Sequence, residues 1–445
     1  MNRRYIPIAA ALVLTTAWTM NATAQDEVYS LKDCLEQGLE NNYNLQITRN
    51  DEQIARNNAT WANAGYLPTI NLEGGYNGTH NTTETTLRET GEKTKQTGVT
   101  DHTLDAGVSL GWTLFDGLQI TANHQTLKEL KRQGETNTRI AIEDLVAEIA
   151  AEYYNLLQQQ IRLKNFRYAV SLSKERLRIV EARYNIGDHS RLDYQQAKVD
   201  FNADSAQYMK QQELLHTSRI RLNELMGNEN VNQRLRIKDR IIDVNDSLQF
   251  TQLSESMMTI NAQLFRAEQN QTLAQLDYKK VRSRDYPYLK VNADYGYTYN
   301  KYEVAANSKR TNLGLNVGAT LGFRLFDGNR KRERQNARIK IENARIEREG
   351  LELSLRAEIS NLWQAYENNL QMLQLERDNL IAARDNHNIA KDRYLLGDLS
   401  GIEMREAQKS LLDAEERILE CQYNTKLCEI SLLQISGQIL RYLED

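Results

Sequence analysis

An internal duplication constrains the fold of this chain more than any other feature of its sequence. Residues Gly107–Gly117 (GVSLGWTLFDG) return as Gly318–Gly328 (GATLGFRLFDG), 211 positions later. The turn-like segment Arg183–Asp188 returns as Arg393–Asp398, at an offset of 210. Ordered matches at a nearly constant offset indicate two copies of one structural unit. We therefore expect a first repeat over residues 25–235 and a second over residues 236–445.

Each copy contains two segments in which apolar and polar residues alternate. The alternation predicts strands at about residues 67–79 and 102–115, and again at about residues 287–300 and 311–326. In the last of these, Leu313, Leu315 and Val317 face away from glycine, asparagine and threonine. Such lengths suit tilted strands that cross a membrane, with the glycine-rich polar face lining a lumen. A soluble sandwich is the alternative that alternation alone leaves open.

Each strand pair is followed by a long segment without proline. Residues 118–184 and 328–394 are 67 residues each, about 100 Å as helices. Apolar residues recur in them every seven positions, which is typical of coiled-coil packing, with His387 as a break. They are Ile142, Ile149, Leu156, Leu163, Val170, Leu177 and Tyr184, then Ile359, Tyr366, Leu373, Leu380 and Tyr394. We expect tips at 185–190 and 395–400, and return helices at 190–226 and 400–436.

The N-terminus indicates export from the cytoplasm. Arg3 and Arg4 precede an apolar stretch from Ile6 to Met20, and Ala22-Thr23-Ala24 supplies a small-x-small cleavage site. This pattern predicts a signal peptide over residues 1–24, with an N-terminal membrane anchor as the alternative. Export together with the alternating strands favours an outer-membrane barrel. Four strands cannot close a barrel, so the chain must oligomerise; two copies would give eight strands, and we favour three copies with twelve.

Composition excludes several classes of protein. The 56 basic residues against 60 acidic ones give no reason to expect a nucleic-acid partner. The mean hydropathy of -0.66 excludes a polytopic helical membrane protein. Cys34, Cys421 and Cys428 are too few for a disulfide scaffold. The histidines and cysteines lack metal-binding spacings, so we expect neither a metal nor a cofactor.

One motif associated with catalysis occurs in the chain. Gly107-Val-Ser-Leu-Gly111 matches the nucleophile elbow of hydrolases, which requires a strand-to-helix turn and a nearby histidine and acid. Here Ser109 is expected in the middle of a strand, and its counterpart in the second repeat is Thr320. We therefore predict that the chain is not an enzyme.

Taken together, these motifs resemble those of the TolC-like outer membrane efflux proteins. The resemblance is carried by the duplicated Leu-Phe-Asp-Gly, the Arg-Tyr-x-x-Gly turns and Leu67-Pro68 before the first strand. It implies a mainly α-helical chain whose long coiled-coil helices form a periplasmic tunnel. Its four strands would join a trimeric twelve-stranded barrel in the outer membrane.

The resemblance also implies partners and a role. A periplasmic adaptor protein and an inner-membrane pump of the resistance-nodulation-division or ABC type would dock at the far end. The assembly would export drugs, other small molecules or proteins, as a tripartite efflux or type I secretion system. The alternative from another class is a barrel-anchored coiled-coil stalk or adhesin. The tail after Gly437 is short for the family, so a smaller belt around the tunnel is expected.

Two sets of candidate site residues follow from the same resemblance. Family members carry acidic residues around the periplasmic entrance, and Glu403 and Glu406 align with two of those positions. Asp193 is the counterpart of Glu403 in the first repeat, so the expected gate residues are Asp193, Glu403 and Glu406. The alternative is that they only favour the dipole of a helix start. The family's entrance arginine is replaced by Leu399, for which Arg191 or Arg405 could substitute. The expected adaptor-docking tips are Gly187, Asp188, Ser190, Arg191, Gly397, Asp398, Leu399 and Ser400.

Overall fold

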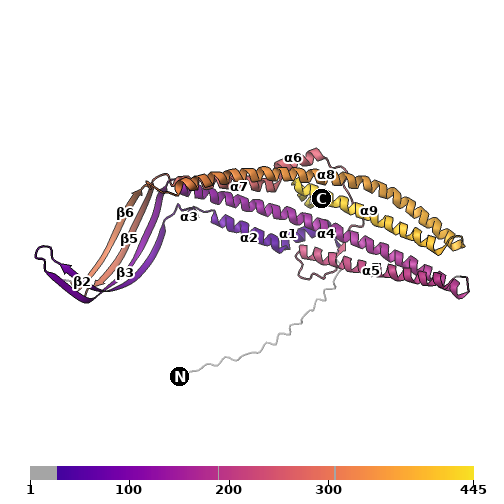
Figure 1. Cartoon of the computed structure of the whole chain (residues 1–445), viewed down its shortest axis with the longest axis horizontal. Helices are drawn as coiled ribbons and strands as arrows, with labels where there is room; N and C mark the ends of the chain where they lie inside the picture. The colour runs from indigo at the N-terminus through magenta and orange to yellow at the C-terminus, as the bar shows by residue number, and fades with distance from the viewer. Residues whose placement is uncertain (1–27, 189, 305–306, 445) are drawn as a thin grey trace, which may run out of the picture.

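The computed structural model describes residues 28–188, 190–304 and 307–444, so the predicted signal peptide lies outside the described residues. Strands lie at one end of the long axis and helical tips at the other (Figure 1). The two longest helices are α4, Gln119–Asn185, and α8, Arg330–Leu396. Each runs from the sheet to a tip, where a shorter helix turns back. The prediction of long helices combined with four strands is confirmed.

The return helices are α5, Arg191–Leu225, and α9, Gly401–Ile435. They are 35 residues each, about half the length of α4 and α8. At about 1.5 Å per residue the long helices extend about 100 Å and the return helices about 50 Å. Another element must therefore accompany the sheet-proximal half of each long helix.

That element is the helix that leads into each strand pair. It comprises α2, Tyr43–Asn58, with the single turn α3, Trp61–Ala64, in the first repeat, and α7, Ala262–Ser283, in the second. A buried asparagine joins each to the end of a return helix. Asn42 Nδ2 donates to the Leu225 carbonyl at 3.0 Å, and Asn261 Nδ2 donates to the Ile435 carbonyl at 2.8 Å.

Both asparagines also cap the helix that they precede. The Asn42 side chain accepts from the Leu45 N–H, and that of Asn261 accepts from the Gln263 and Leu264 N–H groups. One side chain thus satisfies a free donor at a helix start and a free acceptor at a helix end. Each return helix and its neighbour are stacked end to end, which gives the helical part a nearly constant number of helices along its length.

The seven-residue repeat describes α8 better than α4. In α8, Ile359, Tyr366 and Leu373 are buried, and His387 occupies the next but one position with only 3% of its surface exposed. In α4 the residues of the predicted seven-residue repeat no longer face the helix–helix interface near the tip. Tyr184 is 38% exposed, while Val180 is buried instead. A straight helix drifts by about 20° per heptad, so a strict repeat leaves the seam over such a length unless the helix supercoils.

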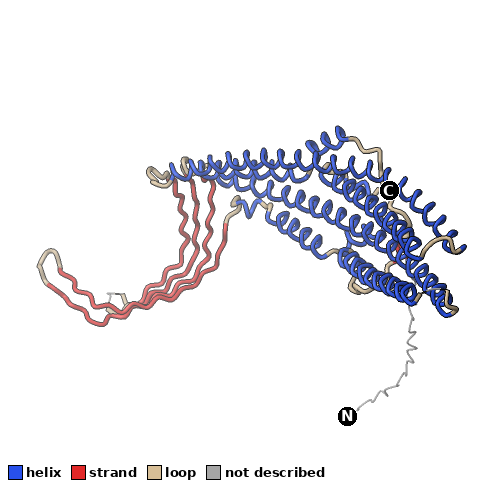
Figure 2. The backbone as a smooth tube through the Cα atoms, turned by 45° about the vertical axis from the view of Figure 1, so that its right-hand side comes forward, coloured by secondary structure: helices blue, strands red, loops and turns tan. Residues whose placement is uncertain are grey.

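The strands form one antiparallel sheet in the order β2-β3-β5-β6. Their bounds are Thr69–Thr86, Lys93–Asp116, Tyr288–Lys301 and Lys309–Gly322. The expected ends at 79 and 102 are wrong, because the first hairpin continues almost to its turn. It projects well past the second hairpin (Figure 2). The expected end at 326 is also wrong: beyond the Gly322–Tyr288 pair the next partner would be Pro287, which has no N–H to donate.

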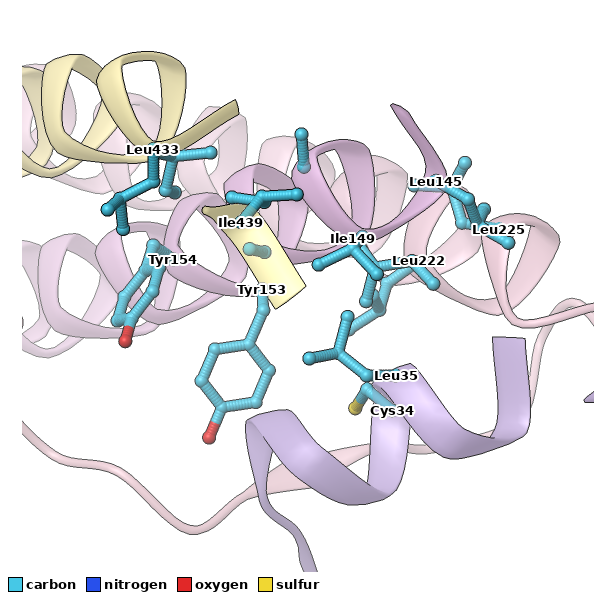
Figure 3. Packing of buried hydrophobic residues seen from close by; sticks show 14 of the residues in the cluster. Cys34, Leu35, Leu145, Ile149, Tyr153, Tyr154, Leu222, Leu225, Leu433 and Ile439 are labelled. Atoms are coloured by element: carbon cyan, nitrogen blue, oxygen red, sulfur yellow. The ribbon is translucent and has the colours of Figure 1, made fainter. Parts of the chain in front are cut away.

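A belt of short elements surrounds the middle of the helical part. It contains β1, Val28–Tyr29, paired in parallel with β4, Arg236–Ile237, together with α1, Leu31–Asn41, α6, Phe250–Ile260, and the 3-10 helix Ile439–Leu443. Figure 3 shows Leu35, Ile149, Tyr153, Leu222 and Ile439 converging there from four segments. The Tyr153 hydroxyl donates to Asp239 at 2.9 Å, which fixes the segment between the repeats. The largest apolar core of the described chain is therefore this belt.

Two further observations concern the described residues as a whole. No helix among them is both long enough and apolar enough to cross a lipid bilayer. Cys34, Cys421 and Cys428 carry free thiols, and burial raises the pKa of the Cys34 thiol to about 12. At neutral pH that thiol is protonated, so it packs in the belt as an apolar group.

Candidate functional site

The tip turns have the same geometry in both repeats. Gly187 and Gly397 take left-handed backbone angles, with φ of 83° and 87°. The next N–H closes the turn, from Asp188 to the Arg183 carbonyl and from Asp398 to the Arg393 carbonyl, both at 2.9 Å. Residues with a Cβ rarely adopt such a φ, so the repeated glycine is required where the long helix ends.

Serine, and not aspartate, begins each return helix. The Ser190 hydroxyl accepts from the Asp193 N–H at 3.1 Å, and the Ser400 hydroxyl accepts from the Glu403 N–H at 3.2 Å. The acid three residues on accepts the serine hydroxyl and N–H in return, which completes a capping box at each tip. Asp188 and Asp398, in the turns before these serines, are therefore not the N-cap residues. Arg191 lies directly after the first cap and is exposed.

The three candidate gate acids differ in their surroundings. Glu403 is exposed, and the Ser400 hydroxyl and N–H hold the pKa of its carboxyl below the usual value. Mutual repulsion between gate carboxylates would raise that pKa, so the capping role dominates Glu403 within one chain. Asp193 occupies the equivalent capping position in the first repeat. Glu406 lies one turn further along α9 and is exposed.

A groove of about 380 Å³ separates the two return helices near the tips. Asp193 lines it from α5 and Glu406 lines it from α9. Glu403 is not among the lining residues. The structure thus brings two of the three candidate gate acids, Asp193 and Glu406, to one groove between the repeats. Asp193 also caps its helix, as Glu403 does, so Glu406 is the candidate that has no capping role. The other lining residues are Arg176, Val180, Leu192, Gln196, Ala197, Asp200, Gly401, Ile402 and Arg405.

Two ion pairs involve residues that line this groove. Arg405 of α9 donates to both carboxylate oxygens of Asp204 on α5, at 2.7 and 2.6 Å. Arg176 of α4 contacts Asp200 of α5, and its side chain is only 5% exposed. Hydrogen bonding to Asp204 raises the pKa of Arg405, so the guanidinium stays charged. Arg405 therefore ties the second hairpin to the first, whereas Leu399 packs half-buried beside Ala390 and Tyr394.

Four exposed aliphatic residues at the tips were not anticipated from the sequence. Ile186 and Leu396 are 79% and 78% exposed, and Leu192 and Ile402 are 76% and 75% exposed. Ile186 and Leu396 are 210 positions apart, and so are Leu192 and Ile402, so each of the two pairs occupies matching places in the two repeats. Isolated exposed apolar residues are ordinary, but a repeated pair at each of two solvent-exposed tips is not. The repeat offset, combined with apolar residues in a polar turn, is the signal that could have identified them.

The sheet has one apolar and one polar face at the other end of the molecule. Leu72, Leu315, Val317 and Leu321 are between 65% and 83% exposed on the apolar face. The polar face carries a register row of Glu73, Gly107, Gly296 and Gly314 across all four strands. Ser109 lies on this polar face, paired with Asn71 and Asp294 in the middle of β3. It therefore lacks the strand-to-helix turn that a hydrolase nucleophile needs.

Comparison with known proteins covers nearly all of this architecture. The sequence profile described as "Outer membrane efflux protein" matches residues 34–228 and 253–438, in both repeats. The outer membrane protein TolC of Vibrio cholerae serotype O1 is 21% identical over 441 residues, which is 98% of this chain and 94% of that protein.

Solved structures have the same fold. The Campylobacter jejuni CmeC outer membrane channel superposes with a TM-score of 0.75 at 16% identity, over 98% of this chain and 94% of that one. CusC, whose structures were described for folding and transmembrane channel formation, gives a TM-score of 0.74 at 18% identity, over 91% of both chains. The outer-membrane channel OprN gives 0.72 at 18% identity, over 92% of this chain and 90% of that one.

Proposed function

The chain belongs to the outer membrane efflux protein family, and from that premise we propose that three copies assemble into one exit duct. As a family member it is an outer-membrane efflux channel of the TolC type and a component of tripartite efflux systems, with its helical part in the periplasm. It transports and does not catalyse. The proposals below concern what the family alone leaves open: how the copies close, what docks at the tips and which residues guard the entrance.

The observation that carries the trimer is the pair of open sheet edges. β2 and β6 each have a hydrogen-bonded neighbour on one side only. Unpaired strand edges are not tolerated in lipid, since each free N–H or C=O costs several kcal/mol there. Pairing β2 of one copy with β6 of the next satisfies both edges. Three copies give twelve strands, wider than the eight whose interior side chains would fill.

The tips are where we place the adaptor and the pump. In the described chain they are the points furthest from the sheet, and each presents an aliphatic pair: Ile186 with Leu192, and Leu396 with Ile402. The groove between the return helices lies directly beside Leu192 and Ile402. Exposed aliphatic side chains beside a groove that Asp193 and Glu406 help to line suit an adaptor that offers aliphatic and basic side chains. The exported cargo is then small toxic molecules, or proteins, received from an inner-membrane pump of the resistance-nodulation-division or ABC type.

A tip-directed variant tests this docking. Leu192→Gln combined with Ile402→Gln removes one aliphatic knob from each tip without touching the capping boxes. The variant should lose efflux-dependent drug resistance while the trimer keeps its wild-type melting temperature. Met209→Gln is the matched control, because Met209 is 68% exposed on α5 but about 25 Å from the tip. Unchanged resistance in the double variant, or equal loss in the control, would rule out docking through these residues.

The gate proposal now rests mainly on Glu406, with Asp193 beside it, which lines the same groove but also caps α5. In a trimer these two acids would recur three times around one axis, near the mouth of the groove. A ring of carboxylates attracts cations and favours block by divalent ions. Glu406→Gln should weaken block by periplasmic divalent cations in planar bilayers more than Glu403→Gln does, because Glu403 is committed to its cap. Equal block in wild type and Glu406→Gln would leave these acids as solvated helix positions.

A further inference from the structure

The outward face of the sheet ends in a basic row. Strand register aligns Gly78, His102, Lys301 and Lys309 across β2, β3, β5 and β6. The preceding row on the same face is Tyr76, Leu104, Tyr299 and Thr311. Side chains two residues apart on a strand share a face, so both rows belong to the apolar face that carries Leu315 and Val317. Aromatic residues thus give way to basic ones at one level of the sheet.

In the orientation of the proposed function, that level would lie at the edge of the membrane. The apolar band begins at the row of Leu289 and Leu321 and reaches Tyr299 ten residues later. Ten residues span about 33 Å along a strand. At a tilt of about 40° this is about 25 Å along the membrane normal, the height of the apolar band in outer-membrane barrels. The basic row lies one step beyond, on the side away from the helices. With the helices in the periplasm, it faces the headgroups of the outer leaflet.

The two lysines are held close together without a counter-charge. Lys301 and Lys309 are directly opposite each other in the β5–β6 register, and both are exposed. Like charges opposite each other destabilise a strand pair. In the part of the chain that the structure describes, no carboxylate lies within ion-pair distance of either ammonium group. Glu303, two residues beyond Lys301, accepts from the Thr100 N–H at 2.5 Å, and Asp101 accepts from the Glu303 N–H at 3.2 Å.

His102 extends the row and is fixed in position. A hydrogen bond of 2.7 Å joins Tyr76 Oη to His102 Nδ1, and the two rings stack with centroids 5.9 Å apart. With Nδ1 engaged by the tyrosine, Nε2 is the ring nitrogen left for a ligand. Neighbouring strands are about 4.8 Å apart, so His102, Lys301 and Lys309 span about 10 Å. That spacing admits one phosphate between neighbouring donors.

From this arrangement we propose that His102, Lys301 and Lys309 bind a phosphate of the phosphorylated glycolipid of the outer leaflet, lipid A. The acyl chains would lie along the apolar face below, against Tyr76 and Tyr299. A bound phosphate offsets the repulsion between the lysines and supplies the missing counter-charge. The inference rests on the proposed function, which sets the orientation in the membrane. In a trimer it gives three equivalent sites around the barrel.

The test measures lipid A binding to the purified trimer by native mass spectrometry. The wild-type trimer should bind up to three molecules of bisphosphorylated lipid A, and Lys301→Gln combined with Lys309→Gln should weaken binding at least tenfold. Removing two opposed like charges should not impair folding. Lys290→Gln is the matched control, because Lys290 lies on the opposite, polar face of β5, near the end of the sheet that joins the helices. It should bind as the wild type does.

Three results would overturn the proposal: equal binding by the double variant and the wild type, equal binding of dephosphorylated lipid A, or equal binding of phosphatidylglycerol. The last two would mean that acyl chains alone, or any phospholipid, occupy the face. Mass and bilayer conductance are measured on the same samples. A conducting trimer that binds no lipid A refutes only this inference, whereas a sample without trimer or conductance refutes the proposed function.

Discussion

The ion pair between Arg405 and Asp204 should hold the two helical hairpins together at the entrance. The guanidinium makes two short hydrogen bonds to the carboxylate, whose side chain is only 7% exposed, while that of Arg405 is 27% exposed. Arg405→Ala leaves Asp204 charged and largely desolvated. Removing one partner of a buried pair costs about 3–5 kcal/mol, and the partial exposure of Arg405 places this case near about 3 kcal/mol.

That free energy bears on how often the hairpins separate. The pair bridges α5 and α9 and cannot form once they move apart, so its loss favours the separated arrangement. Since about 1.4 kcal/mol corresponds to a factor of ten, about 3 kcal/mol corresponds to a change of about a hundredfold in that equilibrium. Arg405→Ala should therefore raise the open probability of single trimers in planar bilayers by up to about two orders of magnitude.

Two further variants separate this mechanism from general destabilisation. Exchanging the charges, with Arg405→Asp and Asp204→Arg together, should return the open probability most of the way to the wild-type value. Arg417→Ala breaks an ion pair with Glu376 at 3.1 Å, but that pair joins α8 to α9 within one hairpin. It should leave the open probability unchanged. If Arg405→Ala conducts as the wild type does, or if Arg417→Ala opens the channel as much, the reasoning is refuted.

Three other outcomes are expected. Gly107→Val should lower the melting temperature of the trimer, with a cost of about 1–3 kcal/mol, because a Cβ there would lie 2.9 Å from the Gly296 Cα. Gly314→Val in the same row should not, because a Cβ there would meet only the Asn312 side-chain nitrogen, at an ordinary contact distance of 3.9 Å, and equal melting of the two variants would contradict this. Because the folded state lowers the pKa of Glu403, its cap stabilises the fold above the usual pKa of 4.5, and this stability is lost as pH falls through the lower folded pKa. Hydrogen exchange at the start of α9 should therefore speed up on acidification in the wild type but not in Glu403→Gln. Asn42→Ala should lower the free energy of unfolding in chemical denaturation by about 2 kcal/mol, since it leaves the Leu225 carbonyl and the Leu45 N–H unpaired. Asn57→Ala, on the exposed side of α2, should cause no measurable loss.

The sequence predicted those parts of the fold in which one physical signal dominates. Alternation with a consistently apolar face located the membrane-facing portion of each strand, and the absence of proline over 67 residues located the long helices. It did not predict the outer part of the first hairpin. Between His80 and Asp101 the residues are mostly polar, and the apolar Leu87 and Val99 are too far apart to form an alternating pattern. Pairing between the two strands, not burial, makes that segment a sheet.

The candidate site was predicted less completely, for a different reason. Repeat matching placed Gly187, Gly397 and the tip acids in the right turns, but it could not tell a capping acid from a groove-lining one. That distinction depends on side-chain direction: Glu403 turns back to Ser400, while Glu406 faces α5 across the groove. The Arg405–Asp204 pair joins residues 201 positions apart, and no local pattern contains such information.

The central claim is that three copies close the sheet into one barrel, and the mass of the detergent-solubilised complex tests it most directly. Each chain leaves β2 and β6 unpaired on one side, so a single copy cannot satisfy its own edges in lipid. Native mass spectrometry of the protein extracted from outer membranes should give one species containing three chains. A stable species with one chain or two would contradict the account, because neither closes a twelve-stranded barrel with an open lumen.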